Sequence, residues 1–569
     1  MSTSTTDESV PFDEKRISVP VRSGGNVMGI LTTPKTFISE PGPGTRIIVI
    51  AHGFGGHKDY CYQKMLAHGL ASDLGLSSFR FDFRNCGDSS DVPNTAEGRT
   101  IMGTDQEDLD AVIFDYLIGN RKFVLAGIVS HSRGSVAMFQ WAVRNQDRIT
   151  IPSLVNCSGR FRSELFIERI RSVNPNFDRD GGMTAKALRH GQFQDLWFPA
   201  NEVITGAQID MSVISQIKCP VLSVYGLDDE IIPLEDINYF SEALGYHRHQ
   251  LRVLEGANHN FYQLDPETGK KLDNHNPRVV DIVTEWYSPE RERERFLRDF
   301  GVVGTIPRWK KVEGVSNLRD FGGLYNRNGN YVRPELLYRS ANPAHTTEYG
   351  YEQMEHELNI RTIFDLRSIQ ELERNGSASD HGKIKVQWTP IFKDQDLSPE
   401  KLANRHNHYK SDPVEGFKHA YREILDTAGP AYRQIMLHLR DRPNEGVLIH
   451  CTAGKDRTGL ICALILLLAG VDGDIVSREY ELTTEGLRDE LPRLRSSVDE
   501  NLDAEQAKGM LNMLSSKYDA MRVTIAMIED VYGGPEGYFK TQCGLDDNDI
   551  ATIRSNLIAN PSSRYYWHH

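Results

Sequence analysis

The segment FVLAGIVSHSRGSVAMFQWAV, residues 123–143, passes from an apolar strand through a short turn into an amphipathic stretch typical of a helix. At the turn stands Ser130-His131-Ser132-Arg133-Gly134. A serine nucleophile at such a junction needs small residues two positions before and two after it, because larger side chains collide where the backbone turns sharply. Ser130 takes the first place, where glycine is usual, and Gly134 takes the second. The segment therefore predicts an α/β sheet that presents Ser132 at the end of a strand.

Upstream of this turn, an apolar strand ends in HGFGG, residues 52–56. A flexible turn at that point offers backbone N–H groups to a developing oxyanion, as does the residue that follows the nucleophile. We therefore predict an oxyanion hole made of the backbone amides of Phe54 and Arg133.

Downstream, two loops after predicted strands supply the remaining groups that a serine nucleophile requires. The strand VLSVYG (221–226) leads into Asp228 and Asp229, and the segment LEGANHNF (254–261) contains His259. The resulting chain order, serine then aspartate then histidine, is the order found in α/β-hydrolases.

Residues of roughly 15–285 resemble an α/β-hydrolase of the serine esterase, lipase and aminopeptidase type. The motifs that carry the resemblance are HGFGG, FDFRNCGDS, SHSRG, YGLDDEIIP and GANHNF. The resemblance implies that Ser132 is the nucleophile, that His259 is its general base, and that Asp229 orients His259, with Asp228 as the alternative. Such a site cleaves a carboxylic ester, thioester or amide through an acyl-enzyme.

A second motif, GVLIHCTAGKDRTG (446–459), also joins a buried strand to a helix. Backbone amides at such a loop and helix N-terminus converge on one point and favour a bound dianion, and the same field favours the thiolate of Cys451. The planar fork of Arg457 can grip two phosphoryl oxygens, and the Thr458 hydroxyl can donate to the sulfur. The predicted phosphate-binding residues are Thr452, Ala453, Gly454, Lys455, Asp456, Arg457 and Thr458.

This loop resembles the protein tyrosine phosphatase superfamily, and more narrowly its bacterial and fungal branch with Lys and Asp inside the loop, whose members act on phosphotyrosine and phosphoinositides. Support comes from VSNLRDFGGL (315–324), LLYRSA (336–341) and TIFDLRSIQELE (362–373). The resemblance implies that Cys451 forms a phosphocysteine, that Arg457 binds phosphate and that Lys455 adds positive charge.

The sequence does not decide which residue is the general acid of this second site. A leaving oxygen needs a carboxylic acid within hydrogen-bond reach. Asp456, inside the loop, and Asp365, at the end of a predicted strand, are the two candidates. Asp394 and Asp396 are further alternatives in a loop.

The predicted organisation is α/β throughout: an α/β-hydrolase sheet with a helical lid, then a second α/β domain of tyrosine-phosphatase type. Strand and helix patterns alternate over 1–287, with a helical lid at about 161–215. The segment 288–304 begins SPERERERFLRDFG, in which Glu and Arg alternate too tightly to bury a face, and predicts an exposed helix within a charged linker. Residues 305–569 form the second domain.

Composition narrows the function further. The 569 residues carry a net charge of −14, which argues against a nucleic-acid or anionic-membrane partner, and their longest apolar run is far short of the ~20 residues of a membrane span. The seven cysteines form neither a CxxC pair nor a disulfide framework, which predicts a reducing compartment, the cytoplasm by default. Neither chemistry requires a metal or an organic cofactor, and no cluster has convincing metal-ligand spacing.

These observations lead to one main hypothesis, a bifunctional hydrolase with two covalent nucleophiles. Its substrate would be a small molecule or lipid that carries a phosphate and possibly an acyl linkage. The alternative is a phosphatase, acting on protein phosphotyrosine or phosphoinositide, whose hydrolase-like domain only binds or positions the substrate. The unusual Ser130 leaves that alternative open.

Overall fold

The computed structural model divides into two compact units, Met1–Arg291 and Glu292–His569. The residues that it describes are 11–35, 42–245, 247–265, 267–300, 302–303, 306–392, 413–488, 490 and 516–559. Across these residues, no helix is both long and apolar enough to cross a lipid bilayer.

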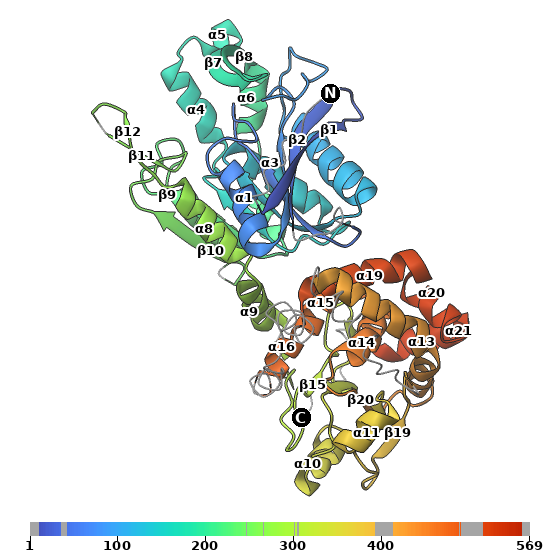
Figure 1. The fold of residues 1–569 in the computed structure, drawn as a ribbon. Helices are drawn as coiled ribbons and strands as arrows, with labels where there is room; N and C mark the ends of the chain where they lie inside the picture. The colour runs from blue at the N-terminus through green and yellow to red at the C-terminus, as the bar shows by residue number, and fades with distance from the viewer. Residues whose placement is uncertain are drawn as a thin grey trace. The chain divides into compact units, whose positions relative to one another are not determined.

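The N-terminal unit is built on an eight-stranded sheet with the order β1-β2-β4-β3-β5-β6-β9-β10 (Figure 1). Strand β2 is antiparallel to both of its neighbours, and the other pairings are parallel. Parallel strands bring their carboxyl ends to one edge of the sheet, where ligands bind in folds of this kind. The strands are β1 (Phe12–Pro20), β2 (Asn26–Pro34), β3 (Arg46–Ala51), β4 (Ser77–Asp82), β5 (Val124–His131), β6 (Leu154–Cys157), β9 (Val221–Gly226) and β10 (His249–Leu254).

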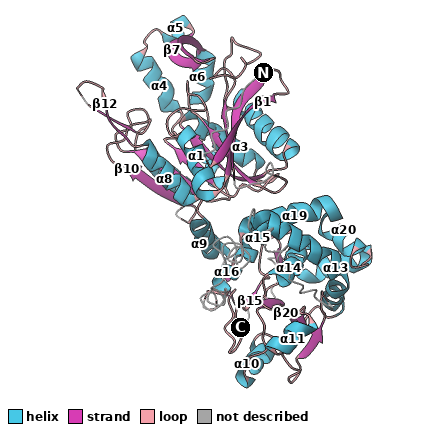
Figure 2. Ribbon diagram, viewed as in Figure 1, coloured by secondary structure: helices cyan, strands magenta, loops and turns pink. Residues whose placement is uncertain are grey.

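Helices cover both faces of this sheet and create a separate apolar core on each side (Figure 2). Alternate residues of β3 enter the two cores: Ile48 and Ile50 pack under α1 and α8, and Ile47 and Val49 belong to the core on the α3 side. Burial on both faces explains why this strand has no polar alternation. The covering elements are α1 (Gln63–Leu74), α2 (Thr104–Asp110) with its π-helical continuation (Ala111–Asn120), α3 (Arg133–Asn145), α7 (Asp236–Leu244) and α8 (Asn276–Trp286).

The lid that the sequence predicts as helical contains a β-hairpin instead at its centre. Strands β7 (Gly182–Arg189) and β8 (Gln192–Pro199) pair antiparallel across His190 and Gly191, which both have positive φ angles of 49° and 79°. Such a two-residue turn matches the twist of a hairpin, and its sequence signal was missed because histidine replaces the usual Asn or Asp before glycine. The helical part of the lid comprises α4 (Glu164–Val173), α5 (Phe177–Asp180), α6 (Ala200–Ala207) and a 3-10 turn at Ser212–Gln216.

The C-terminal unit contains a five-stranded sheet with the order β15-β17-β20-β18-β19. Only β15 is antiparallel to its neighbour, so β17, β18 and β20 again place their carboxyl ends along one edge. The strands are β15 (Arg319–Asp320), β17 (Leu337–Ser340), β18 (Ile360–Asp365), β19 (Lys385–Trp388) and β20 (Gly446–His450). Short pairings complete both units: β11 (Tyr262–Leu264) with β12 (Lys271–Asn274), β13 (Val302–Val303) with β14 (Ile306–Pro307), and β16 (Tyr331–Val332) with β21 (Ile558–Ala559).

A helical layer packs on the second sheet around α14 (Asp456–Leu468), which is apolar on all sides and buried along most of its length. A helix of this kind is stable only inside a core, and here it anchors the loop that precedes it. The other helices are α10 (Glu348–Glu352) with a π-helical continuation (Gln353–Glu357), α11 (Ile369–Asn375), α13 (Pro413–Asp441), α15 (Gly473–Glu481), α16 (Thr483–Gly486), α19 (Tyr518–Tyr532), α20 (Gly534–Thr541) and α21 (Asp547–Leu557).

The charged segment at 288–304 is not the fully exposed connector that its sequence predicts. It forms the expected helix, α9 (Pro289–Phe300), but Glu292 and Phe296 of that helix are buried one helical turn apart. Phe296 joins the core of the C-terminal unit, and Glu292 forms a 2.8 Å ion pair with Arg478 of α15. Charge alternation alone could not reveal this face, because the partner that neutralises Glu292 lies almost 190 residues away.

Candidate active sites

The turn between β5 and α3 holds Ser132 in the strained conformation expected of a nucleophile. Its φ and ψ angles are 51° and −120°, which L-residues rarely adopt and which persist only where the surroundings enforce them. The Ser132 amide donates to the Cys157 carbonyl at the end of β6. A methyl group at Gly134 would lie 2.4 Å from the His52 carbonyl oxygen, so only glycine fits there.

Ser130, the departure from the usual glycine, is fully buried in this turn. Its hydroxyl lies 3.0 Å from Ser135 Oγ and 3.3 Å from the Val155 carbonyl oxygen. The hydroxyl is therefore satisfied inside the core and leaves the geometry at Ser132 intact.

His259 and Asp229 complete a hydrogen-bonded relay with Ser132. His259 Nε2 lies 3.0 Å from Ser132 Oγ, and His259 Nδ1 lies 2.9 Å from Asp229 Oδ2. The Asp229 side chain is fully buried, and the amides of Ile231 and Ile232 both donate to its Oδ1 at 2.8 Å. The alternative, Asp228, is exposed, so it is Asp229 that faces the imidazole. The arrangement can take a proton from Ser132 and hold the resulting imidazolium.

The loop after β3 lies directly against the nucleophile. A methyl group at Gly53 would come within 3.0 Å of Ser132 Cβ, so the residue that precedes Phe54 packs closely against the nucleophile. Within the described residues, the amides of Phe54 and Arg133 donate to no protein acceptor. Both predicted oxyanion donors are thus available to a ligand.

In the C-terminal unit, the loop from Cys451 to Asp456 curls between β20 and α14. Cys451 is only 3% exposed at the bottom of this loop. Gly454 has a φ angle of 65°, and a methyl group there would lie 2.1 Å from the Ser340 carbonyl oxygen. The loop therefore packs against the end of β17 through a position that only glycine can fill.

Buried side chains hold the carbonyl groups of this loop. Asn317 Nδ2 donates to the Ala453 carbonyl at 3.0 Å, and Arg339 Nη2 donates to the Gly454 carbonyl at 2.7 Å. Glu479 of α15 in turn forms ion pairs with Arg319 at 2.7 Å and Arg339 at 2.6 Å. Since the carbonyls are occupied in this way, the loop can present its amides to an anion.

Arg457 is fixed by a carboxylate that the sequence analysis did not identify. Its two terminal nitrogens each lie 2.6 Å from an oxygen of Glu371 in α11, and Glu371 Oε1 also accepts from Thr452 Oγ1 at 2.5 Å. Burial alone would raise the pKa of Glu371, but the hydrogen bonds and charge of Arg457, together with Thr452, lower that pKa to about 2. Glu371 is therefore ionised at neutral pH and orients the guanidinium.

Replacing Glu371 with alanine is expected to lower kcat/KM for a phosphate monoester by about 10- to 100-fold, because an Arg457 fork without its partner is no longer held in one orientation. Most of this loss should appear in KM, and Glu371→Gln should fall between wild type and Glu371→Ala. Steady-state kinetics would measure the effect. Glu373→Gln, an exposed neighbour on the same helix, is the control, and equal losses in both variants would contradict this role.

The two candidates for the general acid differ in their surroundings. The Asp456 side chain is 37% exposed, lies 3.4 Å from Lys455 Nζ and accepts from the Tyr421 hydroxyl at 2.7 Å. Asp365 is 1% exposed and forms a fork with Arg367, at 2.7 Å for the closest pair. Burial would raise the pKa of Asp365, but His450 and Arg367 outweigh it and lower that pKa, so this carboxyl holds no proton at neutral pH. The structure therefore disfavours Asp365 as the acid. Asp394 and Asp396 lie outside the described residues.

The Thr458 hydroxyl does not form the predicted hydrogen bond to the sulfur. This side chain is fully buried in the first turn of α14, and its oxygen has no partner among the residues that the structure describes. Lys455 is also nearly buried, with its Nζ 5.1 Å from the centre of the Phe417 ring. Lys455 thus ends the loop, and Thr458 lies in the helix that follows it.

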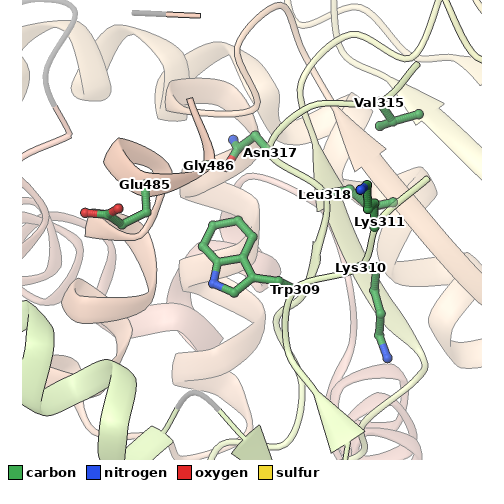
Figure 3. Close-up of a pocket in the computed structure, with 8 residues that line it drawn as sticks. All are labelled: Trp309, Lys310, Lys311, Val315, Asn317, Leu318, Glu485 and Gly486. Carbon is green, nitrogen blue, oxygen red and sulfur yellow. The ribbon is translucent and has the colours of Figure 1, made fainter. Parts of the chain in front are cut away.

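A pocket of about 390 Å³ adjoins the phosphate loop (Figure 3). Figure 3 shows the Trp309 ring in the middle of its lining. Asn317 lines this pocket and also holds the Ala453 carbonyl, so the pocket and the loop share one side chain. The remaining lining residues are Lys310, Lys311, Val315, Leu318, Glu485 and Gly486.

Comparison with known proteins gives a hydrolase family for each half of the chain. Residues 46–165 match the alpha/beta hydrolase fold, residues 180–290 the dienelactone hydrolase family, and residues 310–559 the tyrosine phosphatase family. The Saccharomyces cerevisiae protein YDL057W is 33% identical over 260 residues, 42% of this chain and 78% of that protein. The triple specificity protein phosphatase PtpB of Mycobacterium tuberculosis is 25% identical over 284 residues, 44% of this chain and 99% of PtpB.

Among solved structures, Est1E from Butyrivibrio proteoclasticus is similar over 48% of this chain and 96% of the Est1E chain, with 20% sequence identity and a TM-score of 0.36. The family matches confirm the predicted fold class and the enzymatic character of both halves. The chain thus belongs to two hydrolase families at once, with an α/β-hydrolase fold in its N-terminal half and a tyrosine phosphatase family domain in its C-terminal half.

Proposed function

We propose that this protein is a bifunctional hydrolase, a serine-dependent acyl hydrolase joined to a cysteine-dependent phosphate monoester hydrolase. The observation that carries the proposal is that each half holds a complete nucleophilic site. Ser132, His259 and Asp229 form a continuous relay, and Cys451 lies in a loop whose arginine is already oriented. A domain that only bound its substrate would not need either arrangement.

In the N-terminal site, His259 takes the Ser132 proton as the oxygen attacks a carboxylic ester, thioester or amide carbonyl. The amides of Phe54 and Arg133 hold the oxyanion, and the leaving group receives the proton from His259. Water activated by the same imidazole then releases the acyl group and restores Ser132.

In the C-terminal site, the Cys451 thiolate attacks phosphorus while Arg457 and the loop amides bind the equatorial oxygens. Asp456 protonates the leaving oxygen, and water then hydrolyses the phosphocysteine. Lys455 adds positive charge beside the loop. We further propose a small molecule or lipid with a phosphate, and possibly an acyl linkage, as the substrate. The seven unpaired cysteines support a reducing compartment such as the cytoplasm.

The proposal is tested with the purified full-length chain on 4-nitrophenyl phosphate and on 4-nitrophenyl butyrate. We expect release of nitrophenolate from both, and an excess of one substrate should not inhibit hydrolysis of the other. If no ester is hydrolysed, the N-terminal half either only binds its ligand or acts on a different acyl group.

The role of Asp456 predicts a dependence on the leaving group. In Asp456→Asn, kcat for phenyl phosphate, whose leaving group needs a proton, should fall by about 10²- to 10³-fold. The loss for 4-nitrophenyl phosphate should be much smaller, since nitrophenolate leaves without protonation. Asp365→Asn is the comparison: any loss there should be the same for both substrates. A leaving-group effect in Asp365→Asn alone would assign the acid to Asp365 instead.

A further inference from the structure

Arg160 is a buried cation at the same sheet edge as Ser132. It follows β6 by three residues, and the last residue of β6, Cys157, accepts the hydrogen bond from the Ser132 amide. The lid covers it from two sides: the guanidinium carbon lies 4.7 Å from the centre of the Phe166 ring in α4, and Nη2 donates to the Gly206 carbonyl of α6 at 2.9 Å. Only 5% of the residue is exposed.

Neighbouring buried arginines in this region are neutralised, whereas Arg160 is not. Arg99 pairs with Asp105 at 2.5 Å, and Arg133 pairs with Glu202 at 3.1 Å. Across the described residues, Arg160 has no carboxylate within ion-pair distance, and its Nε has no hydrogen-bond partner. Burial and the charge of Arg133 together lower the pKa of Arg160 to about 9, and the more distant Asp236 offsets only part of this shift. A buried cation without an ion-pair partner lowers the stability of the folded state, which suggests that Arg160 is kept for a function.

Aromatic contacts connect Arg160 with the oxyanion loop. The Phe166 ring that packs on the guanidinium meets the Phe54 ring edge-on, with 5.9 Å between the ring centres. Phe54 also packs against Phe198, which leads into α6, at 4.6 Å. Arg160 therefore lies under the lid helices, and the Phe166 ring links it to Phe54 of the oxyanion loop.

We infer that Arg160 binds an anionic group, a carboxylate or a phosphate, on the acyl substrate that Ser132 attacks. This inference rests on the proposed function of the serine site. The planar guanidinium can grip two oxygens of such a group with the donors that the protein leaves unused, and the apolar ring of Phe166 supports it in that orientation. The serine site would then select substrates with a negative charge near the acyl carbon over neutral ones of the same size.

The wild-type chain is the first test, on three 4-nitrophenyl esters of matched length. Two are anionic, the hemiglutarate and the 4-phosphonobutyrate, and one is neutral, the valerate; the carbon–phosphorus bond of the phosphonate resists the phosphatase site. We expect kcat/KM for at least one anionic ester to exceed that for the valerate by about tenfold or more. The better anion identifies the natural group as carboxylate or phosphate. Equal values for all three esters would overturn the inference.

Substitution then assigns the preference to this residue. In Arg160→Met the ratio of anionic to neutral kcat/KM should fall at least tenfold. The matched control is Arg162→Met, because Arg162 lies two residues further on and is already paired with Asp236 at 2.6 Å, so the ratio should persist there. A preference that survives Arg160→Met would also overturn the inference.

Binding separates a failure of this inference from a failure of the proposed function. Monomethyl glutarate would be titrated calorimetrically into the wild-type chain and into Arg160→Met, which share an unchanged phosphatase site. Weaker binding by Arg160→Met would support the anion site even if no ester were hydrolysed. Equal binding, together with hydrolysis of neutral esters, would leave the serine hydrolase intact and remove Arg160 from substrate recognition.

Discussion

Replacing Cys451 with serine is expected to reduce kcat for phosphate release by about 10⁴-fold or more, or at least about 5.5 kcal/mol of transition-state stabilisation. The loop amides and Arg457 can stabilise a thiolate at neutral pH, but a serine hydroxyl in the same place stays protonated and is a poor nucleophile. Substrate should still bind, because the groups that hold the phosphoryl oxygens are unchanged. Steady-state kinetics and equilibrium binding of a phosphate monoester to the variant would measure both effects.

Two controls make this result specific to the nucleophile. Cys462→Ala removes a cysteine that is fully buried in α14, less than two helical turns beyond the loop, and should leave kcat for phosphate release near the wild-type value. Ester hydrolysis by Cys451→Ser should also be unchanged, since that activity belongs to the other unit. Phosphate release that survives in Cys451→Ser would place the nucleophile elsewhere in the chain.

The residues that perform the proposed chemistry could be predicted from sequence because each sits in a short local motif. The turn around Ser132 and the loop after Cys451 each combine a strand, small residues and a helix within about 20 positions. Strand-end loops also located His259 and the pair Asp228 and Asp229, since the carboxyl ends of parallel strands converge, and the family resemblance then favoured Asp229. The structure brings these residues into contact at 2.9 and 3.0 Å, distances that no spacing could supply.

The residues that hold these catalytic groups in place were harder to predict from the sequence. Glu371 belongs to a local sequence motif, the capping box with Ser368. That motif already explains a glutamate at this position, so it does not reveal that Glu371 also binds Arg457. Glu479 lies 140 residues or more from the two arginines that it binds, so nothing local connects them. Buried ion pairs depend on the tertiary fold, and a sequence pattern records only that charged residues exist.

The lid illustrates a different reason for failure. Its hairpin depends on a His-Gly turn that the usual Asn-Gly signal does not include, and an inserted segment between strands of a parallel sheet favours a helical interpretation. The position of Arg160 depends on the same segment, because α4 and α6 bury it. A residue such as Arg160, whose surroundings come from the lid, therefore cannot be recognised from sequence before the structure of the lid is known.

The second large effect is expected at the other nucleophile: Ser132→Ala should lower kcat for ester hydrolysis by about 10⁴-fold or more. Alanine keeps the volume of the turn but removes the oxygen that His259 Nε2 contacts at 3.0 Å, so no acyl-enzyme can form. Mixing the wild-type chain with excess 4-nitrophenyl ester should give a rapid burst of up to one nitrophenolate per chain if deacylation is slow. Ser132→Ala should give no burst, and its release of phosphate should match wild type.

Ser130→Gly provides the matched control, because it changes the serine two positions earlier and restores the residue that is usual in such turns. The Ser130 hydroxyl contacts Ser135 and the Val155 carbonyl inside the core, whereas that of Ser132 faces the imidazole. Ester hydrolysis should therefore persist in Ser130→Gly, with at most a modest loss of stability from the missing contacts. Equal activity of Ser132→Ala and wild type would mean that the strained turn and its relay only shape a binding site. Loss of ester hydrolysis in Ser132→Ala but not in Ser130→Gly would show that Ser132 is the nucleophile, because the backbone of the turn directs only its hydroxyl to His259.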